Sequence, residues 1–543
     1  MAVVCSILGI KTLPFLLAMI PLPALWWFIL KDWRRGLYGL FMYIPFAGFI
    51  SLQLYPANWP KLLKDIYFVL PTYISFLIQW RRSAPVSPRI PKIIQISLMI
   101  LTVLVIGHMI NPNVRNWILA VIGAKVWLFY LPLIPLTYYF VRRPTDLQEW
   151  FRVLLVSSWI SSLTGLGEWF WCTVSDYQTT MRSIYGPAAM PASQGFARFN
   201  LGHAVLYRIP STFTFPTQYF CFLLCMIVPA YVLMTSDKSQ AWRRFAFATW
   251  IFLQWAAYLS GVRSAYVFTP TLILVCGILG QGLKPALGQG VLTGLVLLVS
   301  LWLPGLIRPI PIAYTPDQAV QVRVEMKKAP TIFSPKPTPI SSAAPALPDS
   351  SKLPVSKSPK PAEAPKTWET HVTAPIQHVI NGGVNMNEWA DMMQYLLIFN
   401  SWDVGIGGIV SALHTSPWGR GTGMNTGAAR YSFNVPDTFT IFRIAESYYA
   451  KSVYELGIFG LLTILTLFGS ILWFALKIHG SLLHSPLRSA SAALIAFFIV
   501  FMIFNLKGCI IDLDPINVFF WVNVGLLFKL PDLAQEVRRG GIV

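Results

Sequence analysis

The chain has 543 residues, of which 55% are hydrophobic and 12% are charged. An ordinary soluble domain carries about 25% charged residues, so this composition excludes a soluble globular protein. Apolar runs of about 18 residues or more recur along most of the chain, and each is long enough to cross a bilayer as a helix. Because the runs are continuous rather than alternating, they exclude a closed β-barrel. The sequence predicts an all-α polytopic membrane protein with about 12–13 transmembrane helices and one large external loop before the last spans.

The charge balance is typical of a membrane protein. The chain carries 42 Lys and Arg against 22 Asp and Glu, a formal net charge of +20. Polytopic membrane proteins collect basic residues in their cytoplasmic connections, so we expect no nucleic-acid partner. The connections that this rule assigns to the cytoplasm are Lys31–Arg35, Arg81–Lys92, Arg142–Arg143, Lys238–Arg244, Lys284, Lys477–Arg488 and the tail with Arg538 and Arg539. The intervening connections, including 173–212 and 308–447, then lie outside.

The candidate spans follow one another along most of the chain. In chain order they lie near 5–30, 37–56, 62–80, 93–111, 115–140, 151–172, 213–235, 245–260, 264–281, 289–307, 450–478, 489–507 and 513–531. The first stretch lacks a small-residue cleavage site, so we interpret it as a retained span rather than a signal peptide. Its three prolines, Pro14, Pro21 and Pro23, are expected to kink it or split it into a hairpin, which leaves the side of the N-terminus open.

The cysteines do not form a pattern of ligands. Six are scattered along the chain in or beside apolar runs, with no CxxC pair. We expect packing roles for them, with neither a disulfide framework nor a metal site, and we predict no cofactor.

Composition divides the chain into three parts. Residues 1–307 form an N-terminal transmembrane bundle, 308–447 an external loop, and 448–543 the C-terminal transmembrane helices with a cytoplasmic tail. Within the loop, about 327–366 is rich in Pro, Ser, Ala and Lys and predicts a disordered linker without a catalytic role. Complexity returns over 368–447, where helical stretches such as 387–399 and 404–414 indicate a folded part over the membrane surface.

Two arginines stand out on the predicted external side. Arg208 lies in YRIPSTFTFPTQYF just before a span, and Arg263 interrupts an apolar stretch in YLSGVRSAYVF. Arginine is costly against hydrocarbon and needs a partner, for which an anionic substrate is one candidate. Snorkelling to lipid phosphate is the alternative for either residue.

A third candidate is the glycine-rich segment SPWGRGTGMNTG. Gly419, Gly421 and Gly423 alternate with Arg420 and Thr422, which suits a tight loop that exposes backbone N–H groups to an anion. An ordinary turn is the alternative. Glu446, before the helix that follows, is either a catalytic carboxylate or a simple cap of the helix N-terminus.

Together these segments resemble the O-antigen ligase and O-antigen polymerase family of bacterial envelope glycosyltransferases. Members carry an arginine before a Ser-Thr-Phe and Pro segment, matched by RIPSTFTFPTQ, and a tip matched by SGVRSA. They also carry a glycine-rich loop and then HNxYLxxxxExGxxG, matched here by SPWGRGTG and ESYYAKSVYELGIFG. The residues in register in the last motif are Tyr449, Glu455, Gly457 and Gly460.

The resemblance covers roughly 200–533 apart from the Pro-rich insertion. One departure is informative, because Glu446 and Ser447 replace the histidine and asparagine of the ligase pattern. This departure favours a polymerase or exopolysaccharide-type member over a lipopolysaccharide ligase in the strict sense.

The resemblance implies a metal-independent glycosyltransferase of the bacterial inner (plasma) membrane that serves surface polysaccharide assembly. Its substrate would be a polyprenyl-diphosphate-linked oligosaccharide, and membrane lipid and other polysaccharide assembly proteins would be further partners. Arg208 and Arg263 would bind the diphosphate and Glu446 would act as the base. Substrate-binding candidates of second rank are Gly419, Arg420, Gly421, Gly423, Arg430, Arg443 and Tyr449, with His414 as a substitute base.

Three rival interpretations remain open at this point. A transporter or flippase of a lipid-linked or anionic solute also has many spans and a few intramembrane charges, but the chain shows no internal repeat. A structural subunit of an envelope complex, docking through the Pro-rich loop, would leave the two arginines without a shared purpose. An O-linked protein glycosylation ligase would use the same donor with a protein hydroxyl as acceptor.

Overall fold

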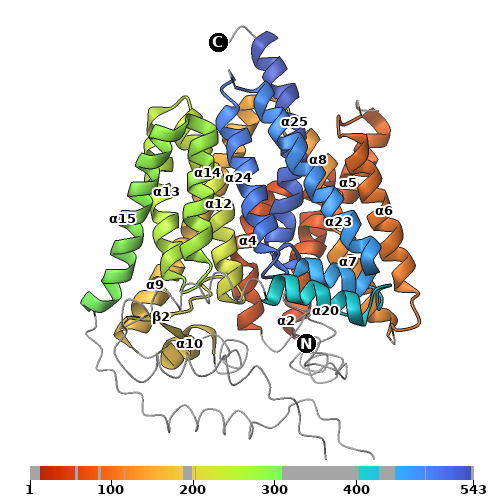
Figure 1. The fold of residues 1–543 in the computed structure, drawn as a ribbon, viewed down its shortest axis with the longest axis horizontal. Helices are drawn as coiled ribbons and strands as arrows, with labels where there is room; N and C mark the ends of the chain where they lie inside the picture. The colour runs from red at the N-terminus through yellow and green to blue at the C-terminus, as the bar shows by residue number, and fades with distance from the viewer. Residues whose placement is uncertain are drawn as a thin grey trace, which may run out of the picture. The chain divides into compact units, whose positions relative to one another are not determined.

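The computed structural model confirms the prediction of an all-helical membrane protein (Figure 1). It describes residues 13–54, 59–83, 87–114, 116–175, 177–186, 198–201, 204–307, 403–426, 447–483 and 485–539. The predicted linker at 327–366, the predicted helix at 387–399, and Arg430, Arg443 and Glu446 lie outside these residues.

The helices of the first half run from α2 to α10. Their bounds are α2 (Leu13–Met19), α3 (Leu22–Lys31), α4 (Trp33–Gln53), η2 (Trp59–Leu62), η3 (Asp65–Val69), α5 (Leu70–Ser83), α6 (Lys92–Met109), α7 (Trp117–Leu128), α8 (Leu133–Phe140), α9 (Pro144–Val174) and α10 (Tyr177–Tyr185). The first predicted span is split by its prolines, since α2 ends before Pro21 and α3 begins directly after it.

The second half begins with a short hairpin that the sequence did not predict. Strands β1 (Arg198–Leu201) and β2 (Ala204–Tyr207) pair antiparallel, with Arg198 opposite Tyr207. The helices that follow are α12 (Pro216–Ser236), α13 (Gln240–Leu259), α14 (Ala265–Gln281), α15 (Leu283–Ile307), η7 (Asp403–Gly407), α20 (Gly408–Thr415), α23 (Tyr448–Ser481), α24 (Arg488–Phe504), η8 (Ile510–Asp512) and α25 (Ile516–Arg539). The helix predicted at 404–414 is thus confirmed by η7 and α20.

The described parts of the predicted spans are largely helical, whereas residues 5–12 and 55–56 lie outside the described residues. Among the described residues, eight helices are long and apolar enough to cross a membrane, and three shorter apolar helices accompany them. Two predicted spans, α9 and α13, are not in either group. Both carry charged side chains, such as Glu168 in α9 and Arg243 in α13, which lower their mean hydropathy.

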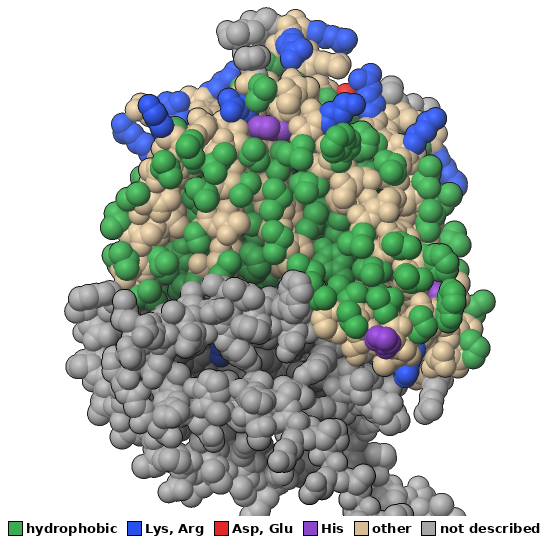
Figure 2. All heavy atoms as spheres, in the orientation of Figure 1, with side chains coloured by type: hydrophobic (Ala, Val, Ile, Leu, Met, Phe, Trp, Pro, Cys, Tyr) green, Lys and Arg blue, Asp and Glu red, His purple; other side chains and the backbone are tan. Residues whose placement is uncertain are grey.

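Basic side chains are concentrated at one end of the bundle. Figure 2 shows Lys and Arg side chains gathered along one end of the visible face, with a broad belt of hydrophobic side chains beside them. In the same orientation, α10, β2 and α20 lie at the opposite end (Figure 1). By the positive-inside rule we expect the basic end to be cytoplasmic, and α10, the hairpin and α20 to lie on the outer side.

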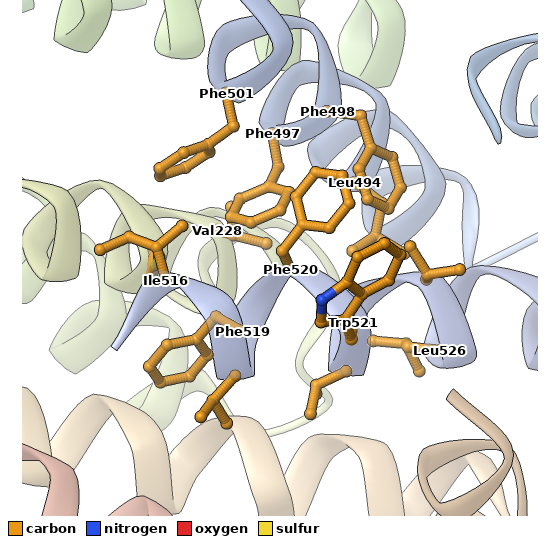
Figure 3. Packing of buried hydrophobic residues seen from close by; sticks show 14 of the residues in the cluster. Val228, Leu494, Phe497, Phe498, Phe501, Ile516, Phe519, Phe520, Trp521 and Leu526 are labelled. Carbon is orange, nitrogen blue, oxygen red and sulfur yellow. The ribbon is translucent and has the colours of Figure 1, made fainter. Parts of the chain in front are cut away.

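Burial separates central helices from those that face lipid. In the apolar stretches of α12 and α25, 83% of the residues are buried inside the protein, against 22% in α6 and 17% in α15. The centre is rich in aromatic rings, and Figure 3 shows Phe520 of α25 packed close to Phe497 and Phe498 of α24. The predicted packing role of the cysteines is confirmed for Cys221, Cys225 and Cys276, which are buried.

Candidate functional site

Arg208 lies in a segment that is inserted between helices rather than resting on the surface. The segment runs from the end of β2 to the start of α12. The backbone N–H of Phe49 donates to the carbonyl of Thr212 over 2.7 Å. At Gly48 a Cβ would lie 2.2 Å from the Cα of Phe213, so only glycine allows this approach. The main chain that follows Arg208 is therefore fixed against the outer end of α4.

Arg263 lies at the tip between α13 and α14, where the sequence predicted a break. Gly261 has φ +68°, and a Cβ there would lie 2.2 Å from the carbonyl oxygen of Tyr207. The N–H of Ile209 donates to the carbonyl of Ser260 over 3.0 Å. These main-chain contacts hold the segment with Arg208 directly on the tip with Arg263, although the two arginines are far apart in the chain.

The two guanidinium groups are close enough to act on each other electrostatically. Arg208 is partly buried and Arg263 is exposed. Burial first, and then the positive charge of Arg263, lower the pKa of Arg208. Two neighbouring like charges are costly unless anionic or polar groups compensate them. A planar guanidinium binds phosphate in bidentate fashion, so the pair is suited to an anion with several oxygens.

The glycine-rich loop lies against α6, α7 and a break in α23. Inside α23, Gly457 has φ 72° and ψ −171°, which interrupts the helical hydrogen bonds. The loop replaces them, because the N–H groups of Arg420 and Gly421 donate to the carbonyls of Tyr454 (2.7 Å) and Glu455 (3.1 Å). In return the N–H of Ile458 donates to the carbonyl of Pro417 over 2.9 Å. The loop thus satisfies main-chain groups that an interrupted transmembrane helix would leave bare.

The same loop also completes the C-terminus of α6. Thr422 donates from its N–H to the carbonyl of His108 (3.1 Å) and from its hydroxyl to that of Val105 (2.7 Å). Both carbonyls belong to the last turns of α6. The final carbonyls of a helix lack an N–H partner within the helix and need one from elsewhere. No side chain fits at Gly423, because a Cβ there would lie 2.0 Å from the carbonyl oxygen of Leu119.

These contacts correct one detail of the sequence interpretation. The N–H groups of Arg420, Gly421 and Thr422 donate to protein carbonyls, so they are not open to an anion as expected. Gly419, Gly421 and Gly423 do have positive φ, of 81°, 111° and 91°. The glycines are therefore explained by the tight path of the loop, and any anion at this loop would be bound by side chains.

Two side chains predicted to bind substrate have described protein contacts. The Nε–H of Arg420 donates to the hydroxyl of Ser416 over 2.9 Å, and its guanidinium lies 5.5 Å from the ring centre of Tyr454. The hydroxyl of Tyr449 donates to the carbonyl of Met502 in α24 over 2.9 Å. Arg420 is only half-buried and remains a candidate, whereas Tyr449 is buried and connects two helices.

The residues that follow Glu446 in the chain form the start of α23. Ser447 is the N-cap of α23, and the N–H of Tyr448 donates to the carbonyl of Asn505 over 3.0 Å. The adjacent Phe504 packs on Phe268 of α14, with ring centres 4.4 Å apart. The start of α23 therefore lies beside the outer end of α24, which packs on the helix that Arg263 precedes. His414, the predicted substitute base, is exposed near the end of α20.

The sequence interpretation missed a group of ion pairs near the ends of the helices, of which Lys64, Asp65 and Lys451 are buried. Lys64 lies 2.7 Å from Asp65 and 3.2 Å from Asp514, and Lys125 also pairs with Asp65 over 2.5 Å. Lys451 pairs with Asp512 over 2.5 Å. Each lysine stands inside a predominantly apolar stretch, and this is the signal that could have identified them, because intramembrane charges require partners.

Glu455, which is in register with the family motif, is also explained by the fold. One carboxylate oxygen accepts from the N–H of Asn425 over 2.8 Å and the other from the indole of Trp127 over 2.7 Å. The carboxylate thereby joins the glycine-rich loop to α7.

Comparison of the whole chain with protein-family models finds no matching family, and comparison with curated protein sequences finds no match. The resemblance to the O-antigen ligase and polymerase family therefore rests on the motifs alone, and the activity that it implies is a proposal.

Proposed function

We propose that this protein is a membrane glycosyltransferase that polymerises or transfers a polyprenyl-diphosphate-linked glycan on the outer side of a bacterial inner membrane. The observation that supports this most directly is the main-chain contact between the Arg208 segment and the Arg263 tip. It joins two motif arginines on the side opposite the basic connections. An outer-leaflet diphosphate would meet two guanidinium groups there.

The reaction in this proposal is a direct displacement. The acceptor hydroxyl oxygen attacks the anomeric carbon of the donor sugar, and the bond from that carbon to the diphosphate breaks. The electron pair remains on the diphosphate oxygen, where the arginine pair stabilises the growing charge. Glu446 takes the proton from the acceptor hydroxyl. Attack opposite the leaving group inverts the configuration at the anomeric carbon.

The position of a lipid-linked donor in the membrane is consistent with these residue roles. The polyprenyl tail of the donor is apolar and partitions among or beside the helices, while its diphosphate lies at head-group level. Arg420, on the loop that bridges the break in α23, is a second candidate for a phosphate or an acidic sugar. A polymerase would use a growing glycan as acceptor, and an O-linked ligase would use a protein hydroxyl. The donor side of the site is the same for both.

The test is glycan chain growth in membranes that contain the variants Arg208→Ala, Arg263→Ala or Glu446→Gln. We expect each to abolish growth while its abundance in the membrane is unchanged. Arg243→Ala is the matched control, because Arg243 is an exposed arginine near the cytoplasmic end of α13. Full activity in all three site variants would contradict the assignment.

A transporter or flippase remains the second candidate, and one observation favours it. Lys64 and Lys451 are 2% and 1% exposed, and both pair with aspartates near the ends of the helices. Buried charges of this kind mark ion and substrate pathways in carriers. Vesicles reconstituted with the protein and a lipid-linked oligosaccharide separate the two functions. Movement of the lipid across the bilayer without formation of longer glycan would favour the carrier.

A further inference from the structure

Glu168 is a buried carboxyl group beside the Arg208 segment that the proposed reaction does not use. It lies in α9 and is 2% exposed. One of its oxygens, Oε2, accepts from the N–H of Ser211 over 2.8 Å. The other, Oε1, is hydrogen-bonded to the hydroxyl of Tyr185. None of the ion pairs among the described residues includes Glu168.

The hydroxyl of Tyr185 also makes a second hydrogen bond, to the carbonyl oxygen of Ser211. A tyrosine hydroxyl has one hydrogen, and a carbonyl oxygen can only accept. If Tyr185 donates to Ser211, its contact with Glu168 needs a hydrogen from the carboxyl group. A carboxylate would provide none, and two acceptor oxygens would then face each other. Both contacts are satisfied when Glu168 carries a proton on Oε1 and donates it to Tyr185.

This small network holds an unusual backbone conformation. Ser211 has φ +52°, a left-handed conformation that costs a residue with a Cβ about 1–2 kcal/mol. Its three polar groups are all bonded, because its hydroxyl donates to the carbonyl of Ser161 over 2.6 Å. Three residues earlier in the chain lies Arg208. The path from Arg208 towards α12 therefore depends on the bonds that Glu168 and Tyr185 make to Ser211.

We propose that Glu168 is a neutral, protonated positioning residue that holds the Arg208 segment against the Arg263 tip. This inference rests on the proposed function for its consequence on activity. The neutral form has a physical advantage, because an ionised Glu168 would add a negative charge to the segment that carries Arg208, which is to bind an anion. It would also leave a carboxylate buried without a cationic partner, which is costly in a low-dielectric interior.

Substitution by glutamine separates a neutral carboxyl group from a carboxylate. In Glu168→Gln, the amide oxygen can accept from Ser211 and the amide nitrogen can donate to Tyr185, so both bonds persist. We expect this variant to keep glycan chain growth within about twofold of the original rate, because no bond of the network is lost. In Glu168→Ala and Tyr185→Phe the network is broken, and we expect growth per folded protein to fall about tenfold. Glu168→Gln that behaves like Glu168→Ala would overturn the inference.

Infrared spectroscopy of the purified protein tests the proton itself and does not depend on activity. A protonated carboxyl group has a carbonyl band separate from that of carboxylates. We expect Glu168→Gln to lose such a band and Tyr185→Phe to shift it. The matched control is Glu149→Gln on the same helix, since Glu149 is exposed and should lose only a carboxylate band. Loss of a carboxylate band in Glu168→Gln would refute the neutral form.

The two experiments distinguish failure of this inference from failure of the proposed function. If Arg208→Ala, Arg263→Ala and Glu446→Gln all keep full chain growth, the proposed function is wrong, while the infrared band and the thermal midpoint of Glu168→Gln against Glu168→Ala still decide the role of Glu168. If Arg263→Ala is inactive and Glu168→Gln is inactive as well, the arginine site stands and the positioning inference is wrong.

Discussion

The arginine pair and the glycine-rich loop look alike in sequence, since both suggest an anion site, yet the structure uses them differently. At the arginine pair, main-chain hydrogen bonds fix the segments and the charged side chains extend from them. At the glycine-rich loop, the main chain itself is used, because its N–H groups complete the broken helix α23 and the end of α6. One region is built to present charge, and the other to close gaps in helices.

The difference teaches how to interpret glycine-rich motifs in membrane proteins. A helix break at membrane depth exposes carbonyl and N–H groups that water cannot satisfy there. A loop with several positive φ values is a suitable partner for such a break, as Gly419 and Gly457 illustrate by their close approach. A Cβ on Gly419 would lie 2.7 Å from the N atom of Gly457. In this protein the glycine-rich motif serves the architecture of one region, and charge is supplied by another.

After the alanine variants, the largest effect is expected when each arginine is replaced by a lysine, which is a cation without the planar guanidinium. Arg208→Lys and Arg263→Lys keep a cation but lose bidentate binding. If the pair stabilises a diphosphate leaving group, each substitution should reduce chain growth about a hundredfold, as is typical of lost transition-state donors. The thermal midpoint should not change. Lysine variants with the original rate would show that a positive charge suffices and that the guanidinium geometry is not needed.

The next effect is on stability and tests the glycine-rich loop. Gly423→Ala places a Cβ against the Leu119 carbonyl oxygen at a positive φ, so we expect a loss of about 1–3 kcal/mol in the free energy of unfolding. Gly469→Ala in α23 is the control, because its Cβ would meet nothing within 4 Å. Thermal unfolding in detergent measures both. A stable Gly423→Ala protein with no activity would instead assign the loop to the chemistry.

A smaller effect is expected at Arg420, which is a charged side chain on the glycine-rich loop. Its side chain is half-buried and bonded to Ser416, so Arg420→Ala removes one hydrogen bond and one candidate for phosphate binding. We expect the rate of chain growth to fall about threefold, which corresponds to less than 1 kcal/mol. A loss as large as that of Arg263→Ala would add Arg420 to the primary site.

The smallest effect is expected outside both regions. Deletion of 330–365, within the segment that the sequence predicts to be a linker, should leave chain growth unchanged. The measurement compares growth with the amount of protein in the membrane. Normal insertion with loss of growth would show that the segment takes part in the reaction.

The helical spans could be predicted because they depend on local composition. Apolar runs are readable residue by residue, and Arg208 and Arg263 stood out as charges before or inside such runs. The hydrogen bonds of the glycine-rich loop could not be predicted. They depend on the break at Gly457, which does not show in the apolar sequence of α23.

Other features needed three-dimensional contacts for the same reason. Lys64 gave a signal as a charge in an apolar stretch, but its partner Asp514 is far away in the chain. Glu168 looked like an ordinary helical carboxyl group, and only its contacts with Tyr185 and Ser211 give it a role. The β1–β2 hairpin is built from four-residue strands, which are too short to show a period.

The interruption of α23 also bears on the thickness of the membrane. A continuous helix of 34 residues would extend about 51 Å, well beyond a hydrocarbon core of about 30 Å. The break makes the outer piece, Tyr448 to Leu456, a separate short rod that is tied to its neighbours. The long piece that follows, from Ile458 to Ser481, is by itself long enough to cross such a core, so the break lets the outer piece serve the outer surface instead of lengthening the span.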